Sequence, residues 1–150
     1  AGFDSMVTFY EDYAHSVLPQ LHREGVRIDF AYLDASKMFD AVLVNVYFIA
    51  LMLNVGGLIV LDDCGFPGIQ KVTRFLTKHP SFKVDSKFGE FRSGWKTKIL
   101  NKMIKIIPYS HQLFKPEKTQ TEEDLGVNAW CVSFKKVKED DRDWKWFEEF

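Results

Sequence analysis

The sequence is poor in the residues that build disulfide frameworks and metal-binding motifs. It has only two cysteines, Cys64 and Cys131, in 150 residues. Their separation matches neither a zinc motif nor a set of paired disulfides. Sparse cysteine is typical of proteins in a reducing compartment, so we expect a cytoplasmic location.

Long hydrophobic runs are also lacking. The longest apolar stretch, residues 42–60, is interrupted by Asn45, Asn54 and a glycine pair. It is therefore too broken to cross a membrane, and no secretory signal opens the chain. The chain begins at Ala1 without a methionine, a start that is typical of a fragment.

An excess of one charge is absent as well. The formal net charge is −1, which argues against general nucleic-acid binding and leaves nucleic acid out of the expected partners. Hydrophobic residues make up 46% and charged residues 27% of the chain. These values and the length predict a single globular domain with one core.

The hydrophobic patterns alternate between strand and helix along most of the chain. They predict strands at 6–10, 28–34, 58–61, 82–84 and 128–134, and helices at 16–24, 35–53, 69–79 and 138–150. Such alternation is typical of an α/β fold with a right-handed, mainly parallel sheet. We expect an α/β core at 6–84, a cap or substrate region at 85–127, and a last strand with an aromatic helix at 128–150.

Residues 95–105 combine an apolar stripe with several lysines. This pattern predicts a helix, and two interpretations of the helix stay open. It could contact a membrane surface or a phosphate-bearing partner, or it could be a cap whose lysines are solvated, the commoner situation.

Carboxylates follow two of the predicted strands. Asp62 and Asp63 come directly after the buried run Leu58–Leu61, and Asp34 ends the strand predicted at 28–34. Ligands of open parallel sheets bind at the carboxyl ends of the strands, so these side chains are candidates for a site. They could equally do no more than begin the next turn.

The order of these segments resembles the class I S-adenosylmethionine-dependent methyltransferases, in particular the small-molecule O-methyltransferases. The resemblance is carried by residues 18–21, 28–34, 42–44, 56–63 and 66–69, and it covers about residues 6–80. It implies a Rossmann-like sheet of strand order 3-2-1-4-5-7-6 whose last strand is antiparallel. It also implies S-adenosylmethionine as the cofactor and a small hydroxylated molecule as the substrate.

The resemblance further implies roles for individual residues. Asp34, Asp62 and Asp63 correspond to carboxylates that hold a divalent cation, Mg²⁺ or Ca²⁺, which orients the substrate hydroxyls. Lys37 corresponds to a catalytic base. Ala14 and His15 correspond to positions that flank the adenine of the cofactor, and Asp34 is also counted among the cofactor-binding positions.

The sequence departs from the family in its first half. It contains no Gly-x-Gly turn for the methionine end of the cofactor, and only five residues precede the first predicted strand. Residues 34–37 read Asp-Ala-Ser-Lys and match the family motif in part, and Asn45 replaces an acid. We therefore expect the carboxyl-terminal half of such an enzyme, truncated before its third strand and inactive alone.

Two other functions are considered beside the methyltransferase: a non-catalytic module and a nucleotide hydrolase. The chain could be a non-catalytic interaction or dimerisation module, in which a homodimer covers the exposed sheet edge or the aromatic tail. The strand at 6–10 could cover the same edge instead. A nucleotide hydrolase would need a phosphate-binding Gly-x-x-x-x-Gly-Lys-[Ser/Thr] loop, which the sequence lacks.

Overall fold

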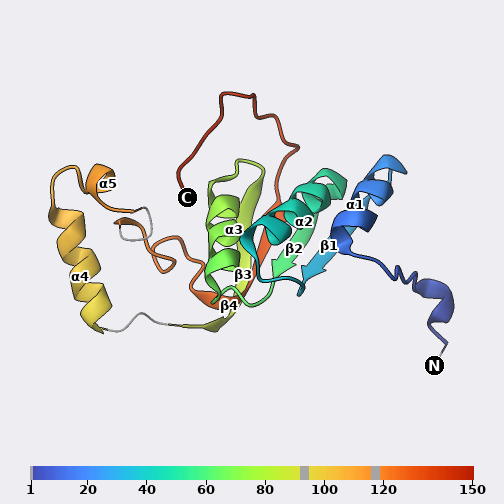
Figure 1. Ribbon diagram of the computed structural model, residues 1–150, viewed down its shortest axis with the longest axis horizontal. Helices are drawn as coiled ribbons and strands as arrows, with labels where there is room; N and C mark the ends of the chain where they lie inside the picture. The colour runs from blue at the N-terminus through green and yellow to red at the C-terminus, as the bar shows by residue number, and fades with distance from the viewer. Residues whose placement is uncertain (1, 92–94, 116–118) are drawn as a thin grey trace.

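The computed structural model describes residues 2–91, 95–115 and 119–150 (Figure 1). Its helices are α1 (Ala14–Arg23), α2 (Phe39–Met52), α3 (Pro67–Lys78), α4 (Trp95–Ile106) and α5 (Ser110–Leu113), preceded by a 3₁₀ turn, η1 (Asp4–Met6). Its strands are β1 (Ile28–Leu33), β2 (Leu53–Leu61), β3 (Phe82–Glu90) and β4 (Ala129–Lys136).

Within these described residues, the strands form one mixed, open sheet of order β1-β2-β4-β3. β1 and β2 are parallel, while β4 is antiparallel to both of its neighbours, β2 and β3. β1, β2 and β3 therefore run in one direction and β4 runs in the other. The predicted α/β fold with a reversed last strand is confirmed at this level.

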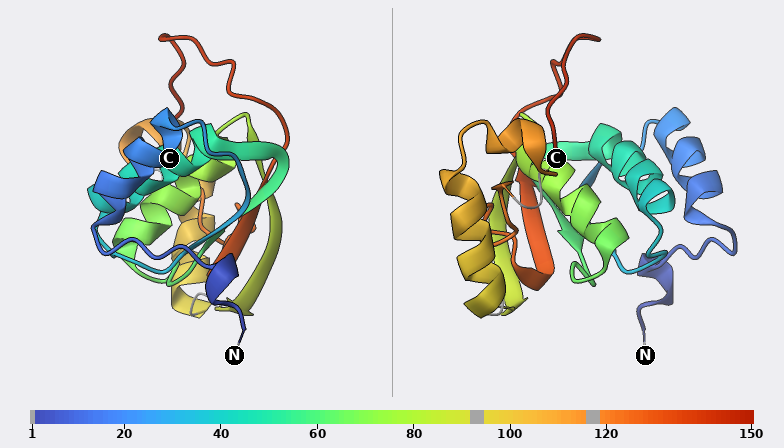
Figure 2. Two further views of the ribbon diagram at one scale, coloured as in Figure 1. Left: turned by 90° about the vertical axis from the view of Figure 1, so that its right-hand side faces the viewer. Right: turned by 60° about the vertical axis from the view of Figure 1, so that its left-hand side comes forward.

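The core lies between the sheet and the three helices α1, α2 and α3, which cover one face of it (Figure 2). Buried side chains from these layers include Val46 and Ile49 of α2, Val72 and Leu76 of α3, and Ile59, Leu61, Val132 and Phe134 of the sheet. α2 is apolar on nearly every side, whereas α3 begins with Pro67, whose fixed φ suits the first helical position. Burial of this apolar area is the main stabilising term of the fold.

The opposite face of the sheet is uncovered along β1. Ala31 and Leu33 of β1 pack toward the core, so the alternating residues Phe30 and Tyr32 point the other way. Their exposed fractions are 58% and 53%. β1 is also an edge strand, because its only described neighbour in the sheet is β2.

Two predicted elements are wrong. Residues 6–10 form no strand: Met6 ends the 3₁₀ turn, and the following residues are exposed without a sheet partner. The proposal that this segment covers the β1 edge is therefore also wrong. The predicted aromatic helix at 138–150 is instead an irregular segment that arches away from β4 and returns to α3 (Figure 1).

Other differences concern element ends. α1 begins at Ala14 rather than near Ser16, so Pro19 lies inside the helix. β3 continues to Glu90 instead of ending near residue 84, because β4 offers a partner along this whole length.

Residues 95–105 do form a helix, as predicted. In α4, Ile104 is buried while Ile99 and Met103 are exposed, so its apolar stripe is covered only in part. Lys96 and Lys98, part of the predicted basic pattern, have side chains outside the described part of the chain. In the part of the chain that the structure describes, no helix has the length and apolar character needed to cross a membrane.

Candidate functional site

The three predicted carboxylates lie at the end of the sheet where β1 and β2 terminate. We call this end of the sheet the carboxylate edge. Asp34 follows the last residue of β1, and Asp62 and Asp63 follow the last residue of β2. The backbone N–H of Asp62 donates to the carbonyl oxygen of Leu33 at 3.0 Å, which continues the strand pairing into the site. Because β1 and β2 are parallel neighbours, their carboxyl ends bring these side chains together.

Lys37 lies between two of these carboxylates. Its Nζ donates to Asp34 Oδ1 at 2.9 Å and to Asp63 Oδ2 at 2.6 Å. The hydrogen bonds to Asp63 and Asp34 raise the pKa of Lys37 well above its usual value. Lys37 is therefore held as an ammonium ion, which suits electrostatic stabilisation better than the predicted role of a general base.

Asp62 has different partners. The hydroxyl of Tyr32 donates to its carboxylate, and the backbone N–H of Asp63 donates to Asp62 Oδ1 at 2.8 Å. The Tyr32 hydrogen bond, supported by this N–H, lowers the pKa of Asp62. The same hydrogen bond raises the pKa of Tyr32 to about 12. Asp62 is thus a fixed anion beside a neutral phenol at neutral pH.

Tyr32 contacts Asp62 at these strand ends, and the sequence interpretation missed it. It belongs to β1, on the same face as Phe30 and two residues before Asp34. The period-2 pattern of a strand would have placed Tyr32 and Asp34 on one side of the sheet. This signal was available in the sequence.

The turn after β2 is held in an uncommon backbone conformation. Asp63 has a φ of 55°, in the left-handed region that aspartate tolerates better than most residues. The next residue, Cys64, donates its N–H to the carbonyl oxygen of Trp130 in β4 at 2.8 Å. A Cβ at Gly65 would lie 2.3 Å from the Trp130 ring, so a larger residue there would require this ring to shift. The turn that carries Asp63 is thus fixed by β4.

The loop that carries Lys37 is fixed by α3. A Cβ at Gly68 would lie only 2.4 Å from the backbone oxygen of Lys37. We expect Gly68→Ala to lower the free energy of unfolding by about 2 kcal/mol, because the clash is with backbone rather than a movable side chain. Urea denaturation measures this change.

The direction of the change in stability distinguishes a crowded glycine from an ordinary helical one. At a helical position without such crowding, alanine would stabilise the protein relative to glycine. The same loss should appear in a Lys37→Met background, since the contact is to the backbone of residue 37. A stabilised Gly68→Ala variant would contradict the packing described here.

Ala14 and His15 lie at the first turn of α1, which runs antiparallel to β1 and so begins at the carboxylate end of the sheet (Figure 1). The His15 ring stacks on Tyr13 at 5.2 Å between centroids. The structure thus brings Lys37 together with Asp34 and Asp63, and Tyr32 with Asp62. It gives Ala14 and His15 no contact with these groups among the interactions of the described residues.

The described residues around Lys37 do not form a ready cation site. Among the described residues, no three His, Cys, Asp or Glu side chains are grouped so that they could hold a metal ion. Lys37 already occupies the space between Asp34 and Asp63. The cavity beside Lys37 and Asp62 has a volume of about 10 Å³, enough for about one water molecule and far too small for a nucleoside.

The chemistry left to this edge is electrostatic. The protonated Lys37, the neutral phenol of Tyr32 and the carboxylates around them can orient a polar group. Such preorganised charges stabilise an oxyanion without reorganising.

No protein-family model matches the chain, and no curated protein matches it.

Proposed function

We propose that the chain is the carboxyl-terminal half of an S-adenosylmethionine-dependent methyltransferase of small hydroxylated molecules and is inactive alone. The observation that carries this proposal is the sheet order β1-β2-β4-β3 with β4 reversed. It agrees with the 4-5-7-6 end of the sheet that the resemblance implies.

The uncovered surfaces support the same proposal. In the family's order, the first strand pairs with the fourth, which corresponds to β1 here. The free edge of β1 is where an amino-terminal half would add its strands, and the exposed Phe30 and Tyr32 lie on the face beside this edge. An apolar edge strand left bare is a liability that folded proteins normally cover.

The carboxylate edge would then form one wall of the active site. Lys37, held in its charged form, would stabilise an anionic substrate oxygen rather than accept its proton. Asp34 and Asp63 would fix the position of Lys37. The reactive methyl group belongs to the cofactor, whose binding would require the other half.

We expect residues 1–150 to bind no S-adenosylmethionine in isothermal titration calorimetry, because the described cavity beside Lys37 is far smaller than this cofactor. A low-micromolar dissociation constant would contradict this. The paired experiment extends the chain with the upstream coding sequence, which the proposal expects to encode a Gly-x-Gly turn. The extended protein should bind the cofactor and transfer a methyl group to a catechol. Absence of the turn would contradict the proposal.

A second candidate function is a non-catalytic dimerisation module. The observation that favours it is the exposed edge strand β1 with two aromatic side chains on its free face. Light scattering after size exclusion should then show a dimer, and Phe30→Lys should return a monomer. Lys83→Ala, on an exposed part of the distant edge strand β3, is the matched control. A wild-type monomer would remove this candidate.

A further inference from the structure

A sizeable pocket lies at the opposite end of the sheet from the carboxylates. Its volume is about 480 Å³, within the range of small-molecule sites. The walls come from α2, from the second half of α3 and the loop that follows it, from the end of β4, and from the carboxyl-terminal segment, residues 137–150. They are mostly apolar. Tyr47, Leu51, Phe75 and Phe150 are among the lining residues.

The carboxyl-terminal segment arches away from β4 and returns to α3 (Figures 1 and 2). Glu139, Asp140, Arg142 and Phe150 of this arch line the pocket. Its end is attached to α3: Lys71 Nζ donates to the backbone oxygen of Phe150 at 2.7 Å, and the Phe150 ring packs edge-on against Phe75. Trp146 also contacts the Phe75 ring. These contacts make the arch a wall of the pocket.

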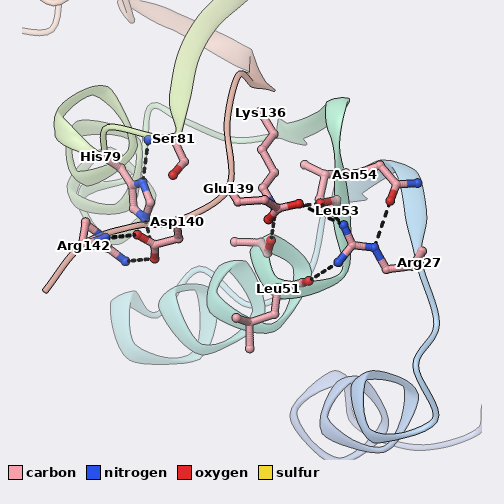
Figure 3. Close-up of polar contacts among 11 residues, drawn as sticks. Arg27, Leu51, Leu53, Asn54, His79, Ser81, Lys136, Glu139, Asp140 and Arg142 are labelled. Atoms are coloured by element: carbon pink, nitrogen blue, oxygen red, sulfur yellow. Dashed lines mark hydrogen bonds and ion pairs between the residues drawn. The ribbon is translucent and has the colours of Figure 1, made fainter.

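The pocket contains a polar group without a partner. Ser81 has an exposed fraction of 0%, and its Oγ has no hydrogen-bond partner among the described residues. Its backbone N–H donates to His79 Nδ1 at 3.2 Å, while the hydroxyl is left out of the dashed contacts in Figure 3. A buried hydroxyl without a hydrogen bond is costly, so a ligand that supplies one gains affinity.

The charged groups of the pocket already have partners. Arg142 donates to both carboxylate oxygens of Asp140, at 2.7 and 2.6 Å, and Lys136 contacts Glu139 at 2.6 Å (Figure 3). Burial, with Arg142 nearby, lowers the pKa of His79 to about 4, so this imidazole is neutral at pH 7. An ionic ligand would meet no unpaired charge here and would have to lose its hydration.

We infer that this pocket binds an uncharged, mainly apolar small molecule that carries one hydroxyl group, with that hydroxyl on Ser81 Oγ. The apolar walls take up the body of the ligand, and Ser81 sets its orientation. The site is independent of the carboxylate edge, and so of the proposed methyltransferase function.

Calorimetric titration with 2-naphthol and naphthalene tests the inference. These probes share a ring system and differ by one hydroxyl. We expect both to bind the wild type, and 2-naphthol to bind about 5-fold more tightly, as one hydrogen bond provides. In Ser81→Ala, naphthalene should bind as before and the preference for 2-naphthol should disappear.

Two variants complete the design. Ala50→Phe places a ring in the pocket from α2 and should abolish binding of both probes, with circular dichroism as the check of folding. Ser5→Ala, in the exposed 3₁₀ turn η1, is the matched control and should leave both affinities unchanged. The inference is overturned if neither probe binds up to its solubility limit. It is also overturned if the preference for 2-naphthol survives in Ser81→Ala.

Discussion

We expect Lys136→Met to lower the free energy of unfolding by about 3 kcal/mol, because Lys136 donates hydrogen bonds to the carbonyl groups at the end of α2. Lys136 is 2% exposed, and its Nζ donates to the carbonyl oxygens of Ala50 and Leu53 at 3.0 and 2.8 Å. Methionine fills a similar volume but offers no donor. Both carbonyl groups would then lose a charge-assisted hydrogen bond.

The reason for this large effect is that α2 ends without a loop. Met52 is the last residue of the helix, and Leu53 is already the first residue of β2. The last carbonyl groups of a helix have no partners within it and carry partial negative charge. Lys136 and Arg27, which donates to Leu51 O at 3.1 Å, supply these partners (Figure 3).

Urea denaturation of Lys136→Met and of its neighbour Lys135→Met measures the effect. Lys135 is exposed, so its variant should lie within about 0.5 kcal/mol of the wild type. Glu139, the ionic partner of Lys136, is also exposed, so Glu139→Gln should cost no more than about 1 kcal/mol. Equal stabilities for the two lysine variants would refute the role of Lys136 as the cap of α2.

The second large effect is expected at the buried guanidinium of α3. Arg74 is 1% exposed, and its Nη1 donates to Glu122 Oε1 at 3.0 Å. We expect Glu122→Gln to cost about 3 kcal/mol, because the cation is then buried without a compensating charge. Arg74 Nε has no hydrogen-bond partner among the described residues, so the site has little further compensation.

A double-mutant cycle separates this charge effect from packing. Arg74→Met removes the buried charge, so adding Glu122→Gln to it should cost much less than Glu122→Gln alone. Glu123→Gln, at the exposed neighbouring position, should change stability by less than about 1 kcal/mol. Additive effects of the two substitutions would show that the pair is not coupled as the structure indicates.

Periodic, apolar segments of this fold could be predicted from the sequence. α2, α3, β1 and β2 have core-facing residues at regular intervals, and their packing agrees with their local pattern. The exposed segment at 6–10 has strand-forming residues and yet forms no strand. Strand propensity reflects packing against neighbours, and this segment has none in the described structure.

The tail from residue 138 onward shows the same limit for helices. Here Asp140 accepts the N–H of Arg142, and Asp143 accepts the N–H of Lys145 at 2.9 Å. Such local bonds from aspartate side chains compete with helical hydrogen bonding. The aromatic residues of the tail then contact α3 from an irregular backbone, which a helical pattern does not reveal.

The candidate site was predictable in its position but not in its pairing. Carboxylates after two adjacent parallel strands must meet at one edge, and they do. Which carboxylate pairs with Lys37 depends on the left-handed turn at Asp63 and on the close contact of Gly68. These are tertiary constraints that the local sequence does not contain. The pocket around Ser81 depends likewise on an arch formed far along the chain.

The position of β4 has a consequence for the order of events during synthesis. Residues 129–136 come after the other three described strands along the chain, yet β4 lies inside the sheet and pairs with both β2 and β3. A nascent chain leaves the ribosome amino terminus first, so β2 and β3 emerge before the strand that joins them. Until then, their apolar edges are available to chaperones or to other nascent chains. The cooperative sheet can form only once this last strand has been released.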